Sequence, residues 1–69
     1  MNIDIRKSIK NNFKDTQVKE IVDSINSSIK DKDEITLPGM GVFFEILWEN
    51  SNEDLRNNII NIIKKNIDN

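Results

Sequence analysis

The 69-residue sequence contains no cysteine, no histidine and no tyrosine, and it has one tryptophan, one proline and two glycines. The absence of cysteine excludes a disulfide scaffold, a thiolate zinc site and an iron–sulfur centre. The absence of histidine removes the commonest metal ligand and the commonest general base near neutral pH. Because only carboxylates, amines and hydroxyls remain, no residue stands out as catalytic, cofactor-binding or metal-ligating. The sequence predicts a protein that is not an enzyme and carries no cofactor.

Neither sign of charge is in large excess, since the chain has 10 basic and 12 acidic residues and a formal net charge of −2. A protein that coats nucleic acid needs a surplus of cations, and this chain has a deficit. The best candidate for a local nucleic-acid contact is Arg6, Lys7, Lys10 and Lys14, which have no acid between them. Two interpretations stay open: the solvated face of an amphipathic helix, which is favoured, and a small histone-like DNA-binding module.

Long hydrophobic runs are missing as well. The longest, residues 42–48, is interrupted by Glu45 and is far shorter than the ~20 residues that span a bilayer. The N-terminal residues place Asp4 where a signal peptide carries positive charge, and no apolar region follows. The sequence predicts an intracellular protein with no membrane partner, and it indicates no small-molecule substrate.

Hydrophobic residues make up 36% of the chain, and they are large and regularly placed. Thirteen isoleucines and no alanine are present, which favours a packed domain over disorder. A chain of this length forms at most one domain, so a single helical domain is expected over residues 1–69. Its core is small, and apolar residues such as Phe44, Trp48, Ile60 and Ile67 are candidates to pack against a second copy. A homodimeric interaction module is therefore a further open alternative.

Four segments carry apolar residues at helical spacing, and short polar breaks separate them. These segments are 2–13, 16–30, 38–49 and 52–67. In the first segment Ile5, Ile9 and Phe13 recur every four residues, which places them on one face of an amphipathic helix. Similar helical spacing of apolar residues runs through the second and the last segments. The pattern predicts an all-α fold, a small bundle of about four short helices.

Capping residues are expected at the starts of three of these helices. Asn2 or Asp4 is expected to cap the first helix and Thr16 the second, since short oxygen-bearing side chains accept hydrogen bonds from free backbone amides. Ser51, followed three residues later by Asp54, has the form of a capping box for the last helix.

The third segment contains the only proline and both glycines of the chain. Pro38 suits the first turn of a helix, and residues 30–34 before it are predicted to form a charged, solvated loop without a cation site. Residues 40–48 are rich in β-prone side chains, but they do not alternate, so a helix is favoured while a strand stays open. Gly39 and Gly41 lower helix propensity and are explained by close approach of another backbone, with Gly41→Val expected to be worse than Gly39→Ala.

The segment from Leu37 to Trp48, LPGMGVFFEILW, resembles a sequence block of the SspI family, minor small acid-soluble spore proteins of endospore-forming bacteria. The opening MNIDIRKSI is similar to the start of that family, and the length agrees, so the resemblance spans nearly the whole chain. It implies a protein made in the developing forespore and held in the spore core, and it implies no biochemical activity.

The same block is predicted to be the packing centre of the domain. It gathers both glycines, the proline, the tryptophan and two of the three phenylalanines. The residues assigned to this family block and core are Leu37, Pro38, Gly39, Gly41, Val42, Phe43, Phe44, Glu45 and Trp48.

Overall fold

The computed structural model describes residues 4–32 and 34–67. Four α-helices follow one another along the chain, with a short 3₁₀ turn before the third: α1 (Ile5–Phe13), α2 (Val18–Asp31), η1 (Glu34–Thr36), α3 (Leu37–Glu49) and α4 (Glu53–Ile67). Within these described ranges no strand occurs. The predicted all-α class with four helices is confirmed, and the segment 40–48 is helical.

α1 begins where its capping residue places it. The Asp4 carboxylate accepts a hydrogen bond from the backbone amide of Lys7 at 3.1 Å, which satisfies one of the free amides of the first turn. Asp4 is therefore the cap, while Asn2 lies outside the described residues.

The prediction of Thr16 as the cap of α2 is wrong. The Thr16 hydroxyl donates a hydrogen bond to the carbonyl of Phe13 at 2.9 Å, so it serves the end of α1. α2 starts at Val18, and Gln17 precedes it without a side-chain capping bond. In the short break between α1 and α2, the side-chain hydrogen bond therefore goes to the end of α1 and not to the start of α2.

The charged connector is shorter than predicted. α2 continues through Asp31 and ends at Lys32, which has a left-handed backbone with φ of 50°. Glu34 already belongs to η1, which leads directly into α3, and Asp33 lies outside the described residues. Pro38 occupies the first turn of α3, as expected, because a missing amide costs nothing there.

The capping box at Ser51 is also wrong, because Asn52 caps α4. The Asn52 side-chain oxygen accepts a hydrogen bond from the backbone amide of Leu55 at 2.9 Å. The Ser51 hydroxyl donates instead to the carbonyl of Leu47, which lies in the last turn of α3. Ser51 therefore terminates α3, and the cap of α4 falls one residue later than predicted.

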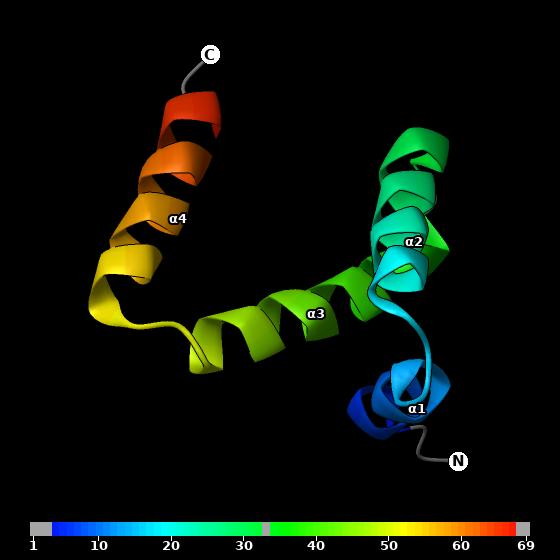
Figure 1. Ribbon diagram of the computed structural model, residues 1–69. Helices are drawn as coiled ribbons and strands as arrows, with labels where there is room; N and C mark the ends of the chain where they lie inside the picture. Colours follow the sequence, from blue (N-terminus) through cyan, green and yellow to red (C-terminus); the bar gives the residue numbers. More distant parts are fainter. Residues whose placement is uncertain (1–3, 33, 68–69) are drawn as a thin grey trace.

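α3 is the central element of the molecule. α1 and α2 pack against it near one end, and α4 extends from the other end with only slight contact to the remaining helices (Figure 1). α2 and α4 are therefore the two separated arms of an open arrangement. The radius of gyration of 13.6 Å reflects this openness.

The core lies where α1 and α2 meet α3. Val42 is 6% exposed and is the only buried residue among those that the structure describes. Beside it, the rings of Phe13 and Phe43 pack edge to face with centroids 5.1 Å apart. The packing centre in the structure is thus smaller than the predicted one, which included the whole family block.

Several block residues lie at the surface because much of the circumference of α3 has no helix against it. Gly39, Phe43, Glu45 and Trp48 are half-buried. The exposed members are Leu37, Pro38, Gly41 and Phe44. The assignment of these four to the core is corrected accordingly.

The close contact expected at a glycine lies at Gly39 and not at Gly41. A Cβ atom on Gly39 would lie 3.1 Å from Cδ1 of Ile9, whereas a Cβ atom on Gly41 would meet nothing within 4 Å. The neighbour is a side chain of α1, and not another backbone. The reason for ranking Gly41 as the more sensitive position is therefore absent.

We expect Gly41→Ala to raise the free energy of unfolding by about 0.5–1 kcal/mol, because alanine is the better helix former and the added methyl group enters open space. Gly39→Ala should gain less, since the Ile9 side chain must shift to admit the methyl group. Urea denaturation followed by circular dichroism measures both variants. A larger gain for Gly39→Ala than for Gly41→Ala would contradict this order.

Candidate functional site

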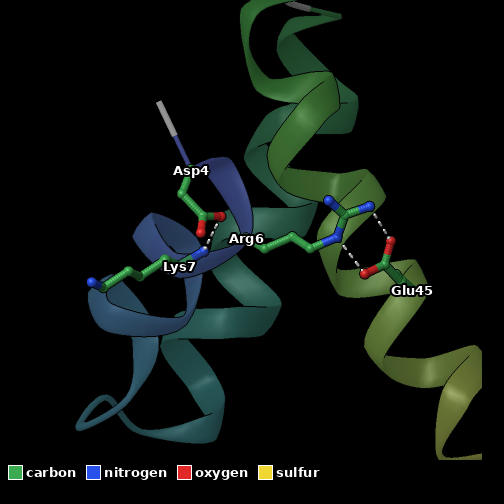
Figure 2. Close-up of polar contacts among 4 residues, drawn as sticks. All are labelled: Asp4, Arg6, Lys7 and Glu45. Atoms are coloured by element: carbon green, nitrogen blue, oxygen red, sulfur yellow. Dashed lines mark hydrogen bonds and ion pairs between the residues drawn. The ribbon is translucent and has the colours of Figure 1, made fainter. Parts of the chain in front are cut away.

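A bidentate ion pair joins the first helix to the third. The Arg6 guanidinium donates from Nε to Oε1 of Glu45 at 2.6 Å and from Nη2 to Oε2 at 2.8 Å (Figure 2). The two residues are 39 positions apart in the sequence, so the pair is a tertiary contact. It links the first turn of α1 to the middle of α3.

Each partner comes from a position that the local sequence constrains. Glu45 is the only charged residue between Leu37 and Trp48, and it stands one turn after the buried Val42. Arg6 lies in the first turn of α1, two residues after the Asp4 cap. A planar guanidinium matches a carboxylate with two parallel hydrogen bonds, which an ammonium group cannot do.

The ion pair shifts the titration of both groups. The hydrogen bonds from Arg6 lower the pKa of Glu45 below its ordinary value, and the contact with Glu45 raises the pKa of Arg6. A carboxyl group whose pKa is lower in the folded state contributes stability above its unfolded pKa and loses that contribution as the pH falls through the folded value. Both side chains remain solvent-accessible, so the contribution is small and screened by salt.

We expect acidification from pH 6 to pH 3 to lower the melting temperature less in Glu45→Gln than in the parent chain, because the variant lacks the carboxylate that Arg6 stabilises. Glu49→Gln is the matched control, since it removes a carboxylate from the same helix without removing the two Arg6 hydrogen bonds. Melting curves at low salt measure the effect, and 1 M salt should reduce it. Identical acid dependence in Glu45→Gln and the parent chain would contradict the expectation.

A largely apolar groove of about 660 Å³ lies between α1, α2 and α3. The side chains that line it come from all three helices: Ile9, Lys10, Asn11, Phe13, Lys14, Ile21, Ile25, Met40, Phe43, Phe44, Ile46 and Leu47. Lys10 and Lys14 are its only charged lining residues. The groove can therefore take apolar side chains, and it has no converging set of polar groups.

The four cations of the candidate nucleic-acid contact do not converge on one surface. The Arg6 side chain extends toward α3 and is bound to Glu45, while Lys7 points the other way (Figure 2). Lys10 and Lys14 line the groove. The DNA-binding interpretation stays a prediction. Arg6 is bound to the Glu45 carboxylate, so the interpretation now depends on Lys7, Lys10 and Lys14.

Arg56, which was not predicted to be a functional residue, contacts Trp48 at the corner between α3 and α4. Its guanidinium lies 5.2 Å from the centroid of the Trp48 ring, and its Nε donates to the Trp48 carbonyl at 3.0 Å. Trp48 in turn stacks on Phe44, with ring centroids 5.8 Å apart. The sequence held a signal for this contact, because Arg56 is the only arginine after Arg6 and follows Trp48 by about two helical turns.

Across residues 4–32 and 34–67, no group of three or more acidic side chains is placed to hold a metal ion. The helices in this part of the chain are all too short or too polar to cross a membrane.

Residues 3–67 match the family model described as small, acid-soluble spore protein I. The chain belongs to this family. Its members include the small, acid-soluble spore protein I of Halalkalibacterium halodurans, which is 31% identical over 67 residues, or 97% of this chain and 98% of the relative. The protein of the same name from Bacillus cytotoxicus is 28% identical over 69 residues, or 100% and 99% of the two chains. No solved structure matches the chain.

The family match covers all four helices as well as Arg6 and Glu45. It confirms the membership that the block from Leu37 to Trp48 indicated, and it makes this chain a small, acid-soluble spore protein of type I. In the structure the block forms α3 from its first residue, Leu37, to Trp48, one residue before its end, and α1 and α2 pack against this helix.

Proposed function

We propose that this small, acid-soluble spore protein I is a non-enzymatic structural component of the spore core. The observation that carries the proposal is the family match over residues 3–67, which spans nearly all of a chain without histidine or cysteine. Its groove is lined mainly by apolar side chains, which suits packing against another surface better than acid–base chemistry.

The test is the location of the protein in spores. Quantitative mass spectrometry compares growing cells, intact spores, spores with their coats removed, and the acid-soluble extract of spores ruptured after coat removal. We expect the protein to be absent from growing cells, to survive coat removal and to enter the acid extract after rupture. Recovery from growing cells, or loss together with the coat, would overturn the proposal.

A further inference from the structure

The monomer exposes more surface than a compact protein of its mass. Its accessible surface is 6197 Å², whereas a compact monomer of 8.0 kDa exposes about 4,450 Å². The radius of gyration agrees, since 13.6 Å compares with about 11 Å for a compact chain of this length. The excess of about 1,700 Å² per chain is surface that a second molecule is able to cover.

Two apolar surfaces form part of this exposed area. One is the groove between α1, α2 and α3. The other is the apolar face of α4, whose exposed members are Leu55, Ile60, Ile62, Ile63 and Ile67. Together with the half-buried Ile59, these residues form an apolar face that covers less than half of the helix circumference. Ile59 and Ile63 lie at the centre of this face. An amphipathic helix and an apolar groove are complementary surfaces.

The corner between α3 and α4 keeps these two surfaces of one chain apart. The Asn50 side-chain amide donates to the Ile46 carbonyl at 2.8 Å, and the Ser51 amide donates to the Trp48 carbonyl at 3.2 Å. Arg56 adds its hydrogen bond to the Trp48 carbonyl and its contact with the Trp48 ring. While these contacts hold, α4 lies apart from α1 and α2 (Figure 1), the two helices that form the groove together with α3.

Charge favours one orientation of α4 in the groove. The charged residues that line the groove are the cations Lys10 and Lys14. α4 carries Glu53 and Asp54 in its first turn and Lys64 and Lys65 in its last turn, so its N-terminal end is the one that suits these cations. The 15 residues of α4 extend for about 22 Å, and the helix presents isoleucines along this length.

We propose that α4 of one copy lies in the groove between α1, α2 and α3 of a second copy, and that the exchange is reciprocal. Two-fold symmetry then covers both grooves and both α4 faces at once. Covering the excess surface of both chains buries about 3,400 Å², which falls in the range of obligate homodimers. The proposal is independent of where in the spore the protein resides.

The first test is the mass in solution. Light scattering on the full chain should give twice 8.0 kDa at micromolar concentration. Ile63→Asp places a charge at the centre of the α4 face and should weaken dimerisation at least tenfold. Asn61→Asp introduces the same charge on the opposite face and should leave the dimer intact. A monomer in the parent chain, or equal weakening in both variants, would overturn the proposal.

The second test uses the absence of natural cysteine to locate the contact. A tagged Leu47→Cys chain, with its thiol at the groove, is refolded together with an untagged Ile63→Cys chain and oxidised. We expect a mixed covalent dimer, and a much weaker product when Asn61→Cys replaces Ile63→Cys. Equal yields from both partners would overturn the exchange. A chain carrying both Leu47→Cys and Ile63→Cys should form covalent dimers, and a closed monomer as its product would show that α4 folds into its own groove.

Discussion

Val42→Asp is expected to abolish cooperative unfolding, whereas Gly41→Asp, one residue earlier on the same helix, should preserve it. Val42 is 6% exposed, so an aspartate there is either an unpaired buried charge or a protonated acid in an apolar site. Either state costs several kcal/mol. A domain of about 70 residues rarely has more than 3–5 kcal/mol to lose.

The control variant, Gly41→Asp, separates the effect of burying a carboxylate from the effect of adding a negative charge. Gly41 is exposed, and a side chain added there meets nothing within 4 Å. Both variants place one new carboxylate in the first half of α3, so their effects on net charge and on the helix dipole are nearly the same. Thermal melts and urea titrations measure the two variants. A cooperative transition in Val42→Asp would show that the core lies elsewhere.

The helices were predictable because periodicity is a local signal. Ile5, Ile9 and Phe13 recur at the spacing that puts them on one face, and Ile9 and Phe13 are the half-buried residues of α1. For residues 40–48 the residue types left both helix and strand open, since valine, phenylalanine and tryptophan also suit strands. The choice is decided by the lack of alternation and by Pro38, which suits the first turn of α3.

Helix boundaries were less predictable, because neighbouring residues of similar chemistry compete for the same role. Ser51 and Asn52 both have capping side chains, but Ser51 is used to end α3 and Asn52 to begin α4. Thr16 shows the same competition, since its hydroxyl binds the last turn of α1. Residue type indicates that a break occurs, and the backbone on both sides decides which residue caps which helix.

Tertiary pairings left the weakest trace in the sequence. Glu45 was notable as the one charge in an apolar segment, but nothing local indicated that Arg6, 39 residues away, would bind it. The glycines make the same point, since Gly39 and Gly41 are alike in the sequence and differ only in whether Ile9 of another helix is nearby. Such contacts depend on how the helices are placed, which periodicity does not determine.

The apolar stripe of α4 is exposed in the single chain. Ile62 is 64% exposed and Ile67 is 68% exposed, although both have the spacing of a buried helical face. Periodicity identifies a face that is apolar, but not the molecule that covers it. The exchange of α4 between two copies reconciles the sequence pattern with the exposed helix, because the stripe is then covered by the groove of the partner.

Phe43→Ala is expected to lower the free energy of unfolding by about 2–4 kcal/mol, since it removes a half-buried ring from the centre of the α1–α3 contact. That loss is close to the whole stability of a domain this small. The ring meets Phe13 edge to face at 5.1 Å, an arrangement that adds about 0.5–1.5 kcal/mol to the burial of the two rings. A milder pair of substitutions measures this added part.

Phe13→Leu, Phe43→Leu and the double variant keep apolar volume and let the chain fold, so urea denaturation yields a complete double-mutant cycle. We expect a coupling of about 0.5–1.5 kcal/mol. The matched cycle replaces Phe43 by its neighbour Phe44, whose ring stacks on Trp48 instead. Phe13→Leu and Phe44→Leu should then be additive within about 0.5 kcal/mol, because their rings belong to different contacts. Additivity between Phe13 and Phe43 would mean that the edge-to-face contact does not hold α1 on α3, and that the Arg6–Glu45 pair and the burial of Val42 carry that interface.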